Sequence, residues 1–127
     1  MHLSKVKKGT LIWITGMAGA GKTTIANQLT LELKKNNYQC IHLDGDSLRR
    51  SVTGLLDNSL SYNIDNRKKL SQTYFKLCKI LTNQEFVVII SSISMYKEIY
   101  EWNKKNFKSY YLIYLNFSKV CFFVWKK

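Results

Sequence analysis

Proline is absent from this chain of 127 residues, where average composition would give about six. A low-complexity segment, an internal repeat and a linker are also absent, which points to one small domain over residues 1–127. No apolar run approaches the ~20 residues that cross a bilayer. The basic start MHLSKVKKGT holds too few apolar residues for a signal peptide. We therefore expect a cytoplasmic protein without a membrane segment.

Cysteine and histidine are both scarce. Cys40, Cys78 and Cys121 lie far apart and are odd in number, and His2 and His42 do not extend them into a metal-binding pattern. Widely spaced cysteines without a partner pattern are typical of reduced thiols in the cytosol. We expect no disulfide framework and no cysteine-based metal centre, and a buried position for Cys78.

Acidic residues are few, with 8 Asp and Glu against 20 Lys and Arg, so the net charge is +12. This excess favours anionic ligands: nucleotides, nucleic acid or acidic surfaces. Nearly all of the positive charge is lysine scattered along the chain, without a basic stripe or a nucleic-acid-binding signature. We therefore expect a small-molecule nucleotide as the partner and no nucleic acid; a basic nucleic-acid-binding ATPase is a weaker alternative.

Apolar residues make up 46% of the chain, enough to bury a core, and their spacing alternates between strand and helix patterns. We expect strands at 11–15, 39–43, 86–92 and 110–115, helices at 22–35, 66–84 and 96–105, and a polar helical segment after residue 46. Trp13 in the first strand is expected to pack in the core. Alternating strands and helices predict an α/β fold with a parallel sheet and helices on both faces.

A glycine-rich stretch follows the first predicted strand and precedes a predicted helix. It satisfies the pattern G-x-x-x-x-G-K-[ST], in which glycines let backbone N–H groups converge on an anion and the helix adds its positive end. Lys22 would reach the β- and γ-phosphates, and the Thr23 hydroxyl would ligate Mg²⁺. We expect ATP or GTP with Mg²⁺, held by Gly16, Met17, Ala18, Gly19, Ala20, Gly21, Lys22, Thr23 and Thr24.

A second polar cluster, HLDGDSLRR, follows the second predicted strand. Carboxylates at the carboxyl end of a parallel strand face the ligand crevice of such a sheet. Asp44 and Asp46 could bind Mg²⁺ through water or take a proton from an acceptor hydroxyl. Arg49 lies about one helical turn past Asp46 and could face the same pocket. The alternative is an aspartate that caps a helix beside a solvated arginine.

The phosphate loop, the segment LDGDSLR, Arg67 at the head of a long helix and the segment VVIISSIS together resemble the adenylylsulfate kinase family, over residues from about Lys8 to Leu115. Members of that family are P-loop kinases that phosphorylate the 3′-hydroxyl of adenylyl sulfate with MgATP. The resemblance implies a three-layer P-loop NTPase fold with a mostly parallel sheet, and a homodimer as a possible assembly. It favours ATP as the phosphoryl donor.

The resemblance also implies roles for individual residues. The expected catalytic residues are Lys22, Asp44, Asp46 and Ser94, with Asp46 preferred as the base. The acceptor would be held by two arginines on its anionic groups, by an aromatic ring on its base, by the two aspartates at its hydroxyl, and by part of the segment SIS. The expected acceptor-binding residues are Asp44, Asp46, Arg49, Tyr62, Arg67, Ile93 and Ser94.

Several positions depart from the family pattern, all of them on the acceptor side. Asn66, Leu70 and Gln72 replace an Asp, an Asn and an Arg, while Ser92 and Met95 replace the Phe and Pro of the motif FISP. The segment ISMYKEIYEWNKKNFKSYYLIYL resembles a branch found in surface-polysaccharide clusters, some of whose members phosphorylate cytidine diphosphoramidate. Adenylyl sulfate is the expected acceptor, and cytidine diphosphoramidate is the alternative.

After residue 115 the family continues into a helix and a basic lid, and nothing in residues 116–127 matches them. A lid of this kind closes over the phosphates and excludes water. We therefore expect a C-terminally truncated fold with a divergent tail, which would lack the lid, a strand and a helix. The strand at 110–115 would then be an exposed edge prone to aggregation. A truncated or frameshifted, inactive ATP-binding fragment is the corresponding alternative function.

Overall fold

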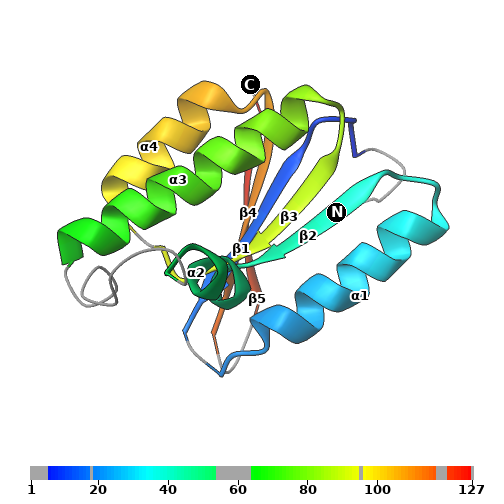
Figure 1. Cartoon of the computed structure of the whole chain (residues 1–127). Helices are drawn as coiled ribbons and strands as arrows, with labels where there is room; N and C mark the ends of the chain where they lie inside the picture. The colour runs from blue at the N-terminus through cyan, green and yellow to red at the C-terminus, as the bar shows by residue number, and fades with distance from the viewer. Residues whose placement is uncertain (1–5, 18, 54–63, 95, 117–119, 127) are drawn as a thin grey trace.

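The computed structural model describes residues 6–17, 19–53, 64–94, 96–116 and 120–126. Strands and helices alternate along most of the chain, as Figure 1 shows. The elements are β1 (Leu11–Gly16), α1 (Lys22–Lys35), β2 (Cys40–Asp44), α2 (Gly45–Thr53), α3 (Ile64–Asn83), β3 (Val87–Ser91), α4 (Lys97–Asn106), β4 (Ser109–Leu115) and β5 (Val120–Lys126). The predicted elements are present, and their ends differ by at most two residues.

The five strands form one sheet in the order β2-β3-β1-β4-β5. The first four are parallel, with Trp13 of β1 opposite Ile90 of β3 and Leu112 of β4. Every residue of β1 and β3 is buried, as expected for parallel strands covered on both faces. The mostly parallel sheet is therefore confirmed.

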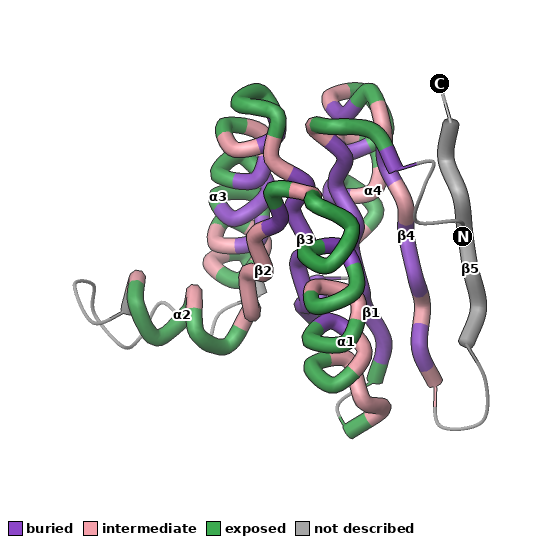
Figure 2. Tube along the Cα trace, turned by 90° about the vertical axis from the view of Figure 1, so that its right-hand side faces the viewer, coloured by how far each residue is buried: buried purple, intermediate pink, exposed green. Residues whose placement is uncertain are grey.

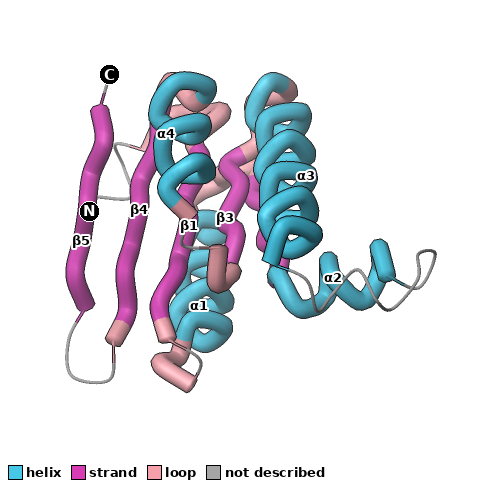
Figure 3. The backbone as a smooth tube through the Cα atoms, turned by 90° about the vertical axis from the view of Figure 1, so that its left-hand side faces the viewer, coloured by secondary structure: helices cyan, strands magenta, loops and turns pink. Residues whose placement is uncertain are grey.

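Helices cover both faces of the sheet, α1 on one side and α3 with α4 on the other (Figures 2 and 3). Side chains alternate along β1, because successive residues of a strand point to opposite faces. Ile12 and Ile14 belong to the cluster beneath α1, while Leu11 and Trp13 belong to the cluster beneath α3 and α4. The three-layer arrangement that the sequence predicts is confirmed.

Trp13 is fully buried at the centre of the second cluster, which confirms its packing role. Its ring centroid lies 4.8 Å from that of Phe75 and 5.0 Å from that of Tyr100, and its indole N–H donates to the Ser92 carbonyl oxygen at 3.3 Å. Cys78 is also buried, as expected, and burial raises the pKa of its thiol to about 12. Cys40 and Cys78 are both free thiols.

The expectation of an exposed edge at β4 is wrong. β5 runs antiparallel to β4 and pairs with it along its whole length, from Ser109 opposite Lys126 to Leu115 opposite Val120. The reason lies in the segment VCFFVW, whose β-branched and aromatic residues favour a strand. The tail thus supplies a strand next to β4, and the edge of the sheet lies at β5.

Among the described residues, no helix combines the length and the apolar character that a membrane crossing requires.

Candidate active site

The loop between β1 and α1 needs glycine at three positions. Gly16, Gly19 and Gly21 have φ angles of +140°, +81° and +92°, which side chains disfavour. A Cβ atom on Gly16 would also lie 2.0 Å from the Leu115 carbonyl oxygen of β4. The loop is therefore held tightly against the sheet, and Ala18 lies outside the described residues.

Lys22 folds back over this loop. Its Nζ atom donates to the carbonyl oxygens of Gly16 and Met17, at 3.2 Å and 2.9 Å. Burial lowers the pKa of Lys22, and the negative charge of Asp46 partly opposes that shift. The first turn of α1 has no acidic residue and no side-chain cap, so its N–H groups and dipole face a prospective anion. Phosphate oxygens would accept more strongly from Lys22 than the two carbonyls do.

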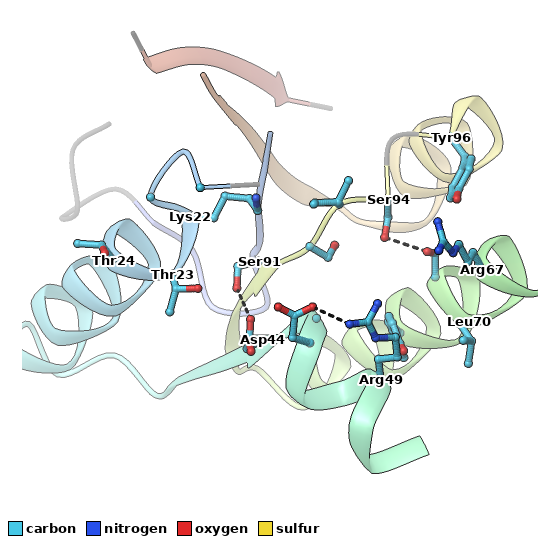
Figure 4. Close-up of a pocket in the computed structure, with 18 residues that line it drawn as sticks. Lys22, Thr23, Thr24, Asp44, Arg49, Arg67, Leu70, Ser91, Ser94 and Tyr96 are labelled. Carbon is cyan, nitrogen blue, oxygen red and sulfur yellow. Dashed lines mark hydrogen bonds and ion pairs between the residues drawn. The ribbon is translucent and has the colours of Figure 1, made fainter. Parts of the chain in front are cut away.

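A pocket of about 580 Å³ extends from this loop across the carboxyl ends of β2 and β3 (Figure 4). In Figure 4, Lys22, Thr23 and Thr24 lie at one end, and Arg67 and Tyr96 lie at the other. Ligands of open α/β sheets bind at this edge of the strands. The expected site residues that line the pocket are Gly19, Gly21, Lys22, Thr23, Thr24, Asp44, Asp46, Arg49, Arg67, Ile93 and Ser94.

The other expected site residues lie elsewhere. Gly16, Met17 and Ala20 belong to the loop but do not line the pocket, and Met17 is exposed. The first two still contribute the carbonyl groups that hold Lys22. Tyr62 lies outside the described residues.

Asp44 is the last residue of β2 and caps α2. One carboxylate oxygen accepts from the backbone N–H and the hydroxyl of Ser47, at 3.2 Å and 3.0 Å. The other oxygen accepts from the Ser91 hydroxyl at 3.4 Å. The capping interpretation therefore applies to Asp44, and the same carboxylate also lines the pocket.

Asp46 and Arg49 form an ion pair of 3.4 Å across one turn of α2. Their side chains are 72% and 51% exposed, and exposed pairs of this kind contribute little to stability. Both residues line the pocket. A ligand could therefore replace either Asp46 or Arg49 in this ion pair at a small cost in free energy.

Several other pocket residues were not among the expected site residues, although Leu70 was noted as a departure from the family pattern. Leu70, Ser71 and Tyr74 follow Arg67 by three, four and seven residues on α3, which is the spacing of one helical face. The Ser71 hydroxyl donates to that of Ser94 at 2.8 Å. A search of the helical face that contains Arg67 could have found all three.

The ends of β2 and β3 add residues that were also not among the expected site residues, although Ser92 was noted as a departure from the family motif. Ser91, Ser92 and Tyr96 line the pocket. His42 lies beside it, with Nε2 3.0 Å from the Ser91 hydroxyl. Burial lowers the pKa of His42, and the charge of Asp44 partly opposes this. These residues lie at or after the carboxyl ends of predicted strands, and that position in the sequence could have identified them as candidates.

The oxygen atoms at the loop end suit a hard cation. Thr23 and Asp44 offer a hydroxyl and a carboxylate on the same pocket. The described residues hold no group of three or more His, Cys, Asp or Glu that could chelate a metal alone. Mg²⁺ characteristically takes one or two protein oxygens and completes its shell with water and substrate phosphates. The donor set therefore fits Mg²⁺ bound together with a nucleotide.

Comparisons with known proteins agree with this site. Residues 8–122 match the adenylylsulphate kinase family. The cytidine diphosphoramidate kinase of Campylobacter jejuni is 40% identical over 105 residues, which are 83% of this chain and 59% of that protein. A probable adenylyl-sulfate kinase of Pyrococcus abyssi is 33% identical over 108 residues, 85% of this chain and 60% of that protein. The chain thus spans about 60% of the length of these curated relatives.

Solved structures show the same fold. The APS kinase of Mycobacterium tuberculosis, in complex with AMPPNP and APS, superposes with a TM-score of 0.74 at 20% identity. That match covers 87% of this chain and 64% of the other. The family match covers most of this chain, and residues of the phosphate loop and of the LDGD segment line one pocket. The chain therefore belongs to the adenylylsulphate kinase family.

Proposed function

We propose that this protein transfers the γ-phosphoryl group of ATP to a hydroxyl group of a nucleotide acceptor. One observation supports this most: a single pocket joins the phosphate loop, with Lys22 and Thr23, to a cationic region with Arg49 and Arg67. A donor phosphate at the first end and an anionic acceptor at the second would meet beside Asp44 and the neighbouring Asp46. Phosphoryl transfer needs this kind of positioning more than covalent chemistry.

At the donor end, the loop N–H groups and the start of α1 would hold the ATP phosphates. Lys22 would exchange its two carbonyl acceptors for β- and γ-phosphate oxygens. Thr23, with Asp44 directly or through water, would hold Mg²⁺. When bound, Mg²⁺ neutralises charge on the phosphate oxygens and orients them.

At the acceptor end, Asp46 would leave its ion pair with Arg49 and accept the proton of the acceptor hydroxyl. A bond then forms between the acceptor oxygen and the γ-phosphorus as the bond from that phosphorus to the bridging oxygen breaks. ADP leaves. Arg49 and Arg67 would balance the negative charge of the acceptor.

We propose adenylyl sulfate as the acceptor, as for the family. Cytidine diphosphoramidate is the second candidate, supported by the 40% identity with the Campylobacter jejuni enzyme of that name. Both molecules are anionic nucleotides, which suits a pocket with two arginines. Leu70 and Ser92, which depart from the family pattern, line the pocket and are consistent with a changed acceptor.

A coupled assay of ADP release with both acceptors tests this proposal. Lys22→Ala is the blank, and Lys34→Ala, at an exposed position near the end of the same helix, is the matched control. We expect acceptor-dependent release by the wild type and the control, reduced at least ~100-fold in Lys22→Ala.

Equal rates in the wild type and Lys22→Ala would refute the kinase assignment. ATP binding without turnover on either acceptor would support the nucleotide-binding fragment. Turnover that needs DNA or RNA would support a nucleic-acid-dependent ATPase.

A further inference from the structure

Two hydroxyl groups in the pocket wall lack a hydrogen-bond partner. Among the described residues, four buried side-chain atoms have none, and two of these, the Tyr74 hydroxyl and the Ser92 hydroxyl, belong to residues that line the pocket. Tyr74 is 6% exposed and Ser92 is 7% exposed. Because buried polar groups are nearly always paired, an unpaired group at a binding pocket indicates a partner that arrives with the ligand.

The neighbouring hydroxyls of the pocket differ in this respect. Ser71 and Ser94 bond each other at 2.8 Å, and Ser91 bonds His42 at 3.0 Å. These groups are already engaged within the protein. Tyr74 and Ser92 therefore stand out as the buried pocket hydroxyls, within the described parts of the chain, that have hydrogen-bonding capacity to spare.

Both unpaired hydroxyls lie near the turn that carries the proposed base. A Cβ atom built on Gly45, between Asp44 and Asp46, would lie 2.9 Å from the Ser92 Cβ atom. Burial raises the pKa of Tyr74, while the nearby charge of Arg49 lowers it and that of Asp46 raises it. Tyr74, Asp46 and Arg49 line the same pocket.

This turn occupies the middle of the pocket. In Figure 4, Asp44 and Ser91 lie between Lys22 at the donor end and Arg67 at the far end. The reacting hydroxyl of the acceptor has to meet the γ-phosphate here, so the part of the acceptor beside that hydroxyl is its sugar. The nucleotide base and the other charged group would extend toward the far end.

We infer that Tyr74 and Ser92 are specificity-determining residues, whose hydroxyls bind the sugar hydroxyl next to the reacting one and select a ribonucleotide acceptor over its deoxy analogue. This inference rests on the proposed function. The exposed Asp46–Arg49 pair rearranges at small cost as the acceptor binds.

The test compares Tyr74→Phe and Ser92→Ala with the wild type. The matched control is Tyr100→Phe, a partly buried tyrosine that packs on Trp13 and does not line the pocket. The probes are adenylyl sulfate and cytidine diphosphate, each with its 2′-deoxy analogue, titrated calorimetrically in the presence of AMPPNP. The melting temperature of each variant without nucleotide is the second readout.

We expect the wild type and Tyr100→Phe to bind the ribonucleotide of at least one pair about three- to tenfold more tightly than the deoxy form. In Tyr74→Phe and in Ser92→Ala, that ratio falls toward one. Their melting temperatures stay equal to that of the wild type or rise, because each change removes an unsatisfied buried hydroxyl. A residue with only a structural role would lower the melting temperature on substitution and leave the ratio unchanged.

An unchanged ratio in both variants would overturn the inference, as would a wild type that does not distinguish ribose from deoxyribose or binds none of the four nucleotides. A variant that instead changes the preference between adenine and cytosine would place its hydroxyl at the base and contradict the sugar assignment. Intact discrimination in binding without phosphoryl transfer would refute the proposed kinase activity and leave this inference standing.

Discussion

At the scale of single residues, His42 connects the edge strand β2 to the site. Its ring lies 3.0 Å from the Ser91 hydroxyl, which in turn donates to Asp44 at 3.4 Å. Burial disfavours the charged imidazolium and lowers the pKa of His42 below 6.5. Protonation of His42 therefore destabilises the folded state.

The sign of the resulting pH dependence follows from linkage. Below pH 6.5 the unfolded chain binds a proton at His42 that the folded chain does not, so the free energy of unfolding decreases as the pH falls. We predict that the melting temperature of the wild type falls between about pH 7.5 and 5.5. In His42→Gln, which removes the titration, part of this fall is lost.

Thermal melts at several pH values measure the effect, with equal ionic strength in each buffer. Parallel pH profiles of the wild type and His42→Gln would contradict a depressed pKa at this residue.

At the scale of secondary-structure elements, the phosphate loop depends on close contact between β1 and β4. Gly16 combines a φ angle of +140° with a position where a Cβ atom would lie 2.0 Å from the Leu115 carbonyl oxygen. Gly21 has a φ angle of +92°, but a Cβ atom there would meet nothing within 4 Å. A side chain at Gly16 would therefore meet both backbone strain and steric overlap, whereas a side chain at Gly21 would meet backbone strain alone.

We predict that Gly16→Ala lowers the free energy of unfolding by about 2–4 kcal/mol, since strain and overlap add. Gly21→Ala, with strain alone, should lower it by about 1 kcal/mol. Urea denaturation at constant pH measures both values. An equal decrease in the free energy of unfolding in the two variants would show that the contact with β4 does not restrict the side chain at position 16.

The helices and parallel strands were predictable because their apolar spacing is local. The residues 67, 70, 71 and 74 also share one helical face that the sequence displays. Their pairing with the end of β3 was not predictable, because Ser71 and Ser94 lie 23 residues apart and only the folded sheet brings them together. The same holds for His42 and Ser91, 49 residues apart.

At the scale of the whole molecule, the two edge strands of the sheet differ in their direction relative to their neighbours. β2 forms one edge, and the antiparallel β5 covers β4 at the other. The parallel core followed from the alternation of strands and helices. β5 did not, because residues 116–127 were expected to be a divergent tail, although their composition favours a strand. The family match in fact extends to residue 122.

We predict that a chain ending at Asn116 aggregates more readily than the full chain. Removal of β5 would leave unpaired those backbone N–H and C=O groups of the apolar strand β4 that face β5, and such an edge templates pairing with other chains. Static light scattering at matched concentrations measures the difference. Equal scattering and equal melting temperatures for the two chains would contradict a protective role for β5.

The central claim is that one pocket brings a nucleotide hydroxyl to the γ-phosphate of ATP. Phosphorus-31 NMR of the protein with ATP, Mg²⁺ and either adenylyl sulfate or cytidine diphosphoramidate tests it most directly. We predict a new phosphomonoester resonance on one acceptor, formed in equal amount with ADP and absent with Lys22→Ala. Release of inorganic phosphate without a phosphorylated acceptor, or the same product from Lys22→Ala, would contradict the account.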